Sequence, residues 1–127
     1  MTTRELLLLW IEALESGRYE QARFALRQEA GGYCCLGVLC DVSKLGTWKH
    51  VLVSADPDLR IEFAHEKWVY EIATGRNFVA MPDDMFAIET GLEWELFREL
   101  TLLNDFHGVD FRQIAQDLRD NVLPNYF

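Results

Sequence analysis

A β-rich middle enclosed between helical segments constrains the fold of this chain more than any other feature. Residues 50–81 are rich in β-branched and aromatic side chains, which favour strands. On both sides of them, apolar residues recur at the three- and four-residue spacing of amphipathic helices. We therefore predict an α+β fold, a single compact domain in which several helices pack on a small, mostly antiparallel sheet. The expected strands are 50–55, 60–64, 68–73 and 78–81, with a hairpin turn at "TGRN" between the last two.

The first helix has clear signals at both of its ends. Thr2 and Glu5 form a capping box, in which each side chain satisfies a free backbone N–H group of the other. Gly17 stands where a glycine usually ends a helix. These signals predict a helix over about 3–16.

The last helix is specified in the same way. Asp110 and Gln113 form a second capping box, and Pro124 is expected to end the helix. The same criteria predict three further helices: 34–45, a short helix that Gly91 closes, and one that starts near Trp94.

The segment 18–28 carries two conflicting patterns. Ala22, Phe24 and Leu26 recur at every second position, which is typical of a half-buried strand. Strong helix formers in the same segment favour a helix instead. We predict an extended segment here.

The length of 127 residues fits one domain, so we place no boundary within 1–127. The apolar run "LLLLWI" is flanked by Glu5 and Glu12, which does not fit a signal peptide. The run is also far shorter than the roughly 20 residues that cross a bilayer. We expect a cytoplasmic protein without a membrane partner, and its odd number of cysteines fits reduced thiols there.

All three cysteines, Cys34, Cys35 and Cys40, lie in "YCCLGVLCD". On a helix that turns about 100° per residue they point in three directions, so we expect no metal site and no cofactor. A disulfide between the adjacent pair would be strained. One remaining reading is a nucleophilic thiol at a helix N-terminus, Cys34 or Cys35, with His65 or His107 as the base. The other is a set of small buried side chains, and we favour it because free cysteine is among the most buried residue types.

The negative charge is concentrated in the last third of the chain. The net charge is −9, and residues 83–127 carry ten acidic and three basic side chains, so they contribute −7. Such a field repels nucleic acid and attracts basic partners, although it also occurs on ordinary soluble surfaces. We expect no direct binding of nucleic acid. The candidate partner-binding residues are Glu89, Glu93, Glu95, Glu99, Asp105, Asp117 and Asp120.

The one basic cluster consists of Arg18, Arg23 and Arg27. If 22–28 is a strand, Arg23 and Arg27 project from the same face and could hold a phosphate or a carboxylate. The alternative is that these arginines pair with the acidic last third, which the charge balance favours. The first reading would make the protein a binder of a small anionic ligand such as a nucleotide.

Four stretches of the chain resemble a group of small bacteriophage and prophage proteins whose activity is not characterised. The stretches are "W-x-x-A-L-x-S-G-x-Y-x-Q" (10–21), "ALR" (25–27), "YCCLGVLCD" (33–41) and "LLND-x-x-G-x-x-F-x-x-IA" (102–115). The middle, about 47–80, is not covered. The group has glycines after the glutamine where this chain has "QARFALR", so the backbone there is expected to differ.

The resemblance implies an accessory phage protein that acts in the cytosol of a bacterial host, and it brings no catalytic residue. Phage proteins of this size often block a host factor. We therefore expect a non-enzymatic inhibitor of a basic host protein that handles nucleic acid or serves in defence, with the acidic residues imitating a nucleic-acid backbone. The alternatives are the anionic-ligand binder and the cysteine-dependent hydrolase. The aromatic tail "PNYF" leaves docking onto a second copy of the chain open.

Overall fold

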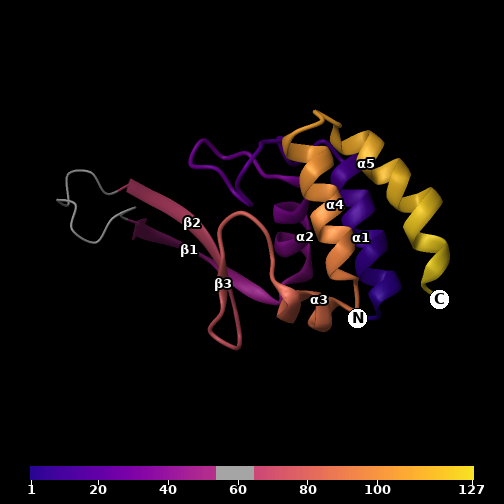
Figure 1. Ribbon diagram of the computed structural model, residues 1–127, viewed down its shortest axis with the longest axis horizontal. Coiled ribbons are helices and arrows are strands. Elements are labelled where there is room, and N and C mark those ends of the chain that lie inside the picture. The colour runs from indigo at the N-terminus through magenta and orange to yellow at the C-terminus, as the bar shows by residue number, and fades with distance from the viewer. Residues whose placement is uncertain (54–64) are drawn as a thin grey trace.

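The computed structural model describes residues 1–53 and 65–127. It shows a compact α+β fold, as the sequence predicts, with a helical body from which a two-stranded ribbon projects (Figure 1). The predicted strand 60–64 lies outside the described residues. Within the described ranges no helix is both long and apolar enough to cross a membrane.

The first two helices form the centre of the body. Helix α1 (Thr3–Glu15) begins where the Thr2 hydroxyl accepts a hydrogen bond from the Glu5 N–H group, and Gly17 follows it with a φ of 76°. Helix α2 (Cys35–Ser43) packs against α1, and the Trp10 indole donates to the Cys35 carbonyl at 2.9 Å. Both predicted helices are confirmed. Lys44 adopts the left-handed conformation that ends α2.

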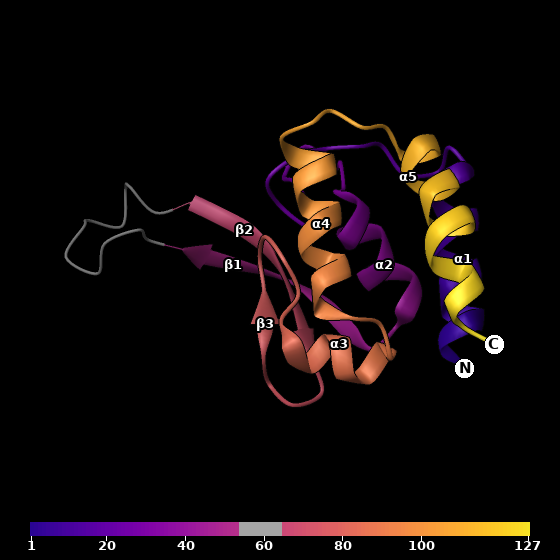
Figure 2. The same ribbon diagram turned by 45° about the vertical axis from the view of Figure 1, so that its right-hand side comes forward.

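Three further helices complete the body. Helix α3 (Asp84–Thr90) starts at the Asp83 cap and ends at Gly91, and α4 (Trp94–Asp105) packs on α2. Helix α5 (Phe111–Asp117) starts at the Asp110 cap and covers α1 on its outer side (Figure 2). The predicted end of this last helix needs a correction. After Asp117 the chain continues through a π turn, Leu118–Val122, into a 3₁₀ turn, Leu123–Asn125, which contains Pro124.

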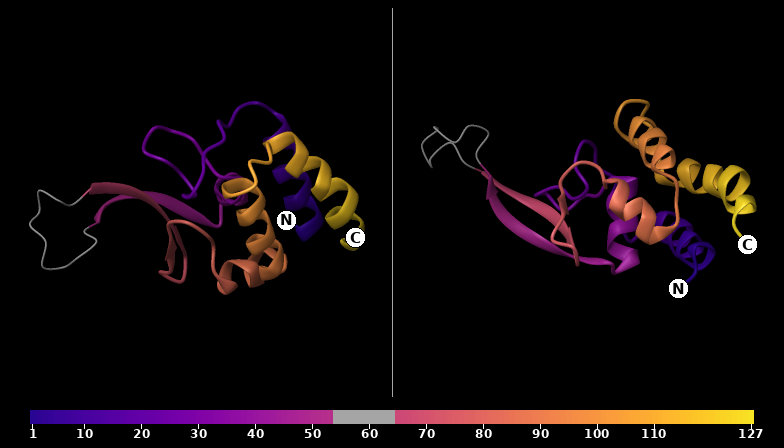
Figure 3. Two further views of the ribbon diagram at one scale, coloured as in Figure 1. Left: turned by 45° about the horizontal axis from the view of Figure 1, so that its top comes forward. Right: turned by 60° about the horizontal axis from the view of Figure 1, so that its bottom comes forward.

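The sheet is antiparallel, with strand order β1-β2-β3. Its strands are β1 (Gly46–Val53), β2 (His65–Ile72) and the short β3 (Asn77–Phe78). The "TGRN" hairpin between β2 and β3 is confirmed by the bond from the Ile72 N–H group to the Arg76 carbonyl. Strand β1 begins four residues earlier than predicted, and the β1–β2 ribbon extends well beyond the helices (Figure 3).

One face of the ribbon carries a row of aromatic rings into the body. The register places Trp48 beside Tyr70 and His50 beside Trp68 on that face. The Trp48 and Tyr70 rings lie 4.9 Å apart, and Tyr70 in turn contacts Phe86 of α3. Edge-to-face aromatic pairs of this kind add to the stability gained from burial. They join the sheet to the helices.

The prediction of an extended segment over 18–28 is wrong. Residues 18–33 form an irregular loop with isolated bridges at Gln21 and Arg27, both to Tyr33. Leu26 is buried as predicted, but the Phe24 side chain is 59% exposed and its φ is 69°. The segment cannot be a regular strand because its backbone groups bond to side chains of α4 and to its own loop.

Candidate functional site

Three of the predicted acidic residues line one hollow. Glu93, Glu95 and Glu99 lie along the first two turns of α4, and the end of the chain, including Tyr126, closes the opposite side. This acidic hollow measures about 240 Å³. The rest of its lining is Leu96, Asn121, Val122 and Asn125.

The lining of the acidic hollow is one-sided in charge. Among the residues that the structure describes, this lining contains three carboxylates and no Lys, Arg or His side chain. Burial raises the pKa of the Tyr126 phenol, and the Glu93 carboxylate beside it raises the pKa further. Glu93 and Glu95 also lie at the N-terminus of α4, where the helix dipole favours negative charge. The helix dipole therefore stabilises the negative charge of Glu93 and Glu95, and both side chains remain exposed to a partner.

The other exposed acidic candidates lie outside the acidic hollow. Glu89 is exposed on α3. The carboxylates of Asp117 and Asp120 accept hydrogen bonds from Asn121 and Gln116, each four residues away on the same helical segment. They add to the negative charge of the surface without sharing a recess with the three glutamates.

Asp105 does not belong to the predicted partner-binding surface. Its side chain is buried, and its carboxylate accepts bonds from the backbone N–H of Phe24 at 3.0 Å and from the Asn104 amide at 2.8 Å. A buried carboxylate with two donors holds the loop in place and cannot meet a partner. The prediction that it belongs to the binding surface is wrong.

A buried polar network around Asn104 was not foreseen. The Asn104 amide joins Gln21, Ala22 and Cys35, so it ties the 18–33 loop and the start of α2 to α4. A sequence signal for it exists, because Asn104 continues the apolar stripe of α4 four residues after Leu100. A polar residue on a buried stripe requires partners.

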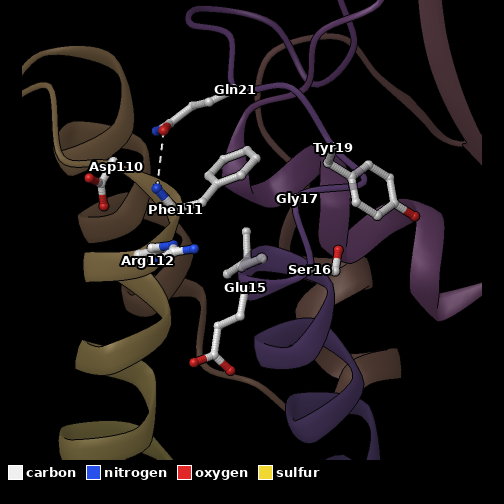
Figure 4. A pocket seen from close by; sticks show the side chains of 9 residues that line it. Glu15, Ser16, Gly17, Tyr19, Gln21, Asp110, Phe111 and Arg112 are labelled. Atoms are coloured by element: carbon white, nitrogen blue, oxygen red, sulfur yellow. Dashed lines mark hydrogen bonds between the residues drawn. The ribbon is translucent and has the colours of Figure 1, made fainter.

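One hollow near the resemblance stretches lies where two elements of the fold meet. It measures about 340 Å³ and lies between the end of α1 and the start of α5. Figure 4 shows the Gln21 side chain next to the backbone of Phe111, whose N–H group donates a hydrogen bond to the Gln21 side-chain carbonyl. The Tyr19 hydroxyl points away from the hollow. That hydroxyl donates to Asp41, and burial followed by this bond raises the pKa of Tyr19 to about 12. Three polar residues of the lining already form hydrogen bonds within the protein: Gln21, Tyr19 and Asp110. This hollow therefore offers few free polar groups to a ligand.

The three arginines do not form one site. Arg18 and Arg23 are exposed at different points of the loop, and only Arg27 lines a hollow. Within residues 1–53 and 65–127 none of them forms an ion pair with the acidic last third. Arg76 and Arg119 do pair with acidic residues, Asp83 and Glu15.

The cysteines are packed in the core. Cys34 caps α2 without a side-chain bond, and all three thiols are buried. Burial raises the pKa of the Cys34 thiol to about 12, and it raises the pKa values of Cys35 and Cys40 well above the ordinary range. The helix dipole would lower a thiol pKa, but the loss of water outweighs it here. Such thiols are small hydrophobic side chains at neutral pH.

We expect the folded protein to resist thiol reagents at pH 7. The thiolate is the reactive form, and a pKa of about 12 leaves almost none of it. Ellman's reagent should therefore react with none of the three thiols within minutes, and with all three in guanidinium chloride. Rapid reaction of one thiol in the folded protein would contradict this and would favour the hydrolase alternative.

Neither of the two histidine side chains that the structure describes, His50 and His107, pairs with those thiols. His50 contacts the carboxylates of Glu29 and Glu66, at 2.7 and 3.4 Å. His107 is exposed after α4, and the side chain of His65 lies outside the described residues. Among the described His, Cys, Asp and Glu side chains, no group of three could hold a metal ion.

Comparison with known proteins identifies a family but no activity. The family model described as "Domain of unknown function (DUF8296)" matches residues 3–122. No curated protein and no solved structure matches the chain.

Proposed function

The chain belongs to the DUF8296 family, a domain of unknown function, and we propose that it is a non-enzymatic binding protein whose acidic surface occupies a basic site on another protein. The observation that carries this proposal is the acidic hollow, in which Glu93, Glu95 and Glu99 line a common recess and form no ion pair within the described residues. Carboxylates without partners attract a basic surface over a long range and speed association.

The partner we propose is a basic host protein that handles nucleic acid or serves in defence. Its positive groove would normally hold phosphates spaced along a backbone. The exposed glutamates at the start of α4, together with Glu89 on α3 and with Asp117 and Asp120 on the last helical segment, present negative charges at several points of one helical body. A phage accessory protein acting in a bacterial cytosol would block the partner in this way.

The alternative of a cysteine-dependent hydrolase has little support. Its nucleophile would have to be Cys34 or Cys35, and both thiols are buried with raised pKa values. The hydrogen bond of the Cys35 thiol goes to the Leu100 carbonyl, within the core.

The test is a capture experiment with a matched pair of variants. The wild-type protein and the triple variant Glu93→Gln, Glu95→Gln, Glu99→Gln are each immobilised on a resin. Both are then exposed to a bacterial lysate at low and at high salt. The control variant carries Glu5→Gln, Glu12→Gln and Glu20→Gln, which are also exposed and change the net charge equally. We expect one basic nucleic-acid-handling or defence protein to bind the wild type and the control. The triple variant should bind it at least about tenfold more weakly.

The remaining outcomes are equally informative. Release of the captured protein by salt, or by added DNA, would support competition for a phosphate-binding groove. Equal capture by the triple variant and the wild type would contradict the proposal, as would capture that salt does not affect.

A further inference from the structure

A second hollow, of about 300 Å³, is built from different elements. It lies between the 18–33 loop and strand β2, and we refer to it as the Arg27 hollow. Its lining includes Phe24, Arg27, Gln28, Glu29, Lys67 and Trp68. Its lining therefore contains two basic residues, two acidic residues (Glu29 and Glu66) and an exposed aromatic ring, whereas the charged residues in the described lining of the acidic hollow are all glutamates.

Arg27 is held by aromatic rings instead of by acidic partners. The central carbon of its guanidinium lies 3.8 Å from the centre of the Trp68 ring, and 5.5 and 5.6 Å from those of Tyr33 and Trp48. Cation–π contacts fix the position of the guanidinium, but the rings do not accept hydrogen bonds from its N–H groups. Its Nε is buried and has no hydrogen-bond partner in the described parts of the chain. Those same parts contain no ion pair to Arg27.

The Arg27 guanidinium is therefore positioned to bind an anion. Its plane is fixed and it has lost part of its water, so an incoming phosphate or carboxylate meets a preorganised fork of donors. Lys67 also lines the hollow, from β2, where its side chain alternates with that of Trp68 across the strand. The carboxylates of Glu29 and Glu66 both contact the His50 ring, at 2.7 and 3.4 Å.

Phe24 adds a ring at the edge of the Arg27 hollow. Its φ of 69° is rare for a bulky residue, and strained positions of this kind persist only where the structure around them holds them. Here the buried Asp105 carboxylate accepts the Phe24 N–H bond, and the ring packs edge-on against Phe106 at 5.5 Å. The result is an aromatic side chain that is 59% exposed yet fixed in direction. Exposed rigid aromatic rings are stacking platforms for planar ligands.

We propose that the Arg27 hollow binds a nucleoside monophosphate, with the phosphate on Arg27 and the base stacked on Phe24. The hydroxyl and amino groups of such a ligand are donors, and the carboxylates of Glu29 and Glu66 together with the Gln28 amide provide acceptors at the rim. The site goes beyond the proposed protein-binding function because it uses none of the acidic residues of α4.

The test is isothermal titration calorimetry with AMP, GMP, CMP and UMP as probes, and with ribose 5-phosphate and adenosine as halves of the ligand. We expect at least one nucleotide to bind the wild type with a Kd below about 1 mM, and each half to bind at least about tenfold more weakly. Arg27→Lys keeps the charge but loses the donor fork, and should weaken binding about tenfold. Arg23→Lys is the matched control on the same loop and should bind within about twofold of the wild type.

Phe24→Gly keeps the test valid if the Arg27 variant loses stability. Glycine adopts a positive φ without strain, so this variant should be at least as stable as the wild type while binding at least about fivefold more weakly. The proposal is overturned if no nucleotide binds the wild type at about 5 mM. It is also overturned if Phe24→Gly, folded, binds as the wild type does, or if ribose 5-phosphate binds as tightly as the nucleotide.

Discussion

Replacing Asn104 with alanine should lower the free energy of unfolding by about 4 kcal/mol. The Asn104 side chain is fully buried. Its amide nitrogen donates to the Ala22 carbonyl and to Asp105, and its oxygen accepts from the Gln21 amide and the Cys35 N–H group. Alanine removes all four bonds and leaves buried groups without partners, each of which costs about 1–3 kcal/mol.

Urea unfolding followed by tryptophan fluorescence measures this effect. Asn125→Ala is the matched control, because its amide makes one exposed bond to the Asn121 carbonyl. The control should change the free energy of unfolding by less than about 0.5 kcal/mol. Similar small losses in both variants would mean that the Asn104 network does not hold the loop to α4.

Replacing Gly37 with alanine should destabilise the protein by about 3 kcal/mol. In a helix interior this substitution usually stabilises by roughly 1 kcal/mol, because alanine is the better helix former. Here α2 lies directly against the loop, and a Cβ atom on Gly37 would overlap the backbone carbonyl of Leu26. Either α2 or the loop must move, and the bond from the Cys34 N–H to the Leu26 carbonyl is then at risk.

The same unfolding measurement decides this prediction. Glu12→Ala, at an exposed position of α1, is the control for a change to alanine in a helix, and it should leave the stability within about 0.5 kcal/mol. A gain in stability for Gly37→Ala would show that the close approach of α2 and the loop is not required.

The resemblance stretches now have a structural explanation. Asp41 at the end of "YCCLGVLCD" accepts bonds from Tyr19 and from the Trp48 indole, and Gln21 bonds to the backbone of Val109 and Phe111. Residues far apart in the chain therefore meet in a few partly buried hydrogen bonds. These stretches hold parts of the fold together, and one of them, 25–27, also supplies Arg27 to the Arg27 hollow.

Part of the candidate site could be predicted because it depends on charge along the chain. Glu93, Glu95 and Glu99 fall within two turns of one helix, so their grouping follows from helical geometry. That Asp105 is buried could not be foreseen from charge, because its burial depends on the loop that packs over it. The recess itself also needs the chain end around Tyr126, which the Arg4 guanidinium holds through the Tyr126 carbonyl at 2.7 Å.

The sequence by itself determined the helices, their caps and the hairpin of this protein. These are local features, since a capping side chain and its backbone partner are two or three residues apart, as at Asp83 and Asp110. Only the tertiary structure decided the course of residues 18–33 and the separation of Arg27 from Arg18 and Arg23. There the backbone finds its partners on α4, more than 80 residues away, and Arg27 finds its aromatic platform on β2. Local propensity cannot specify contacts of that kind, because they form only when distant side chains and backbone groups are buried together.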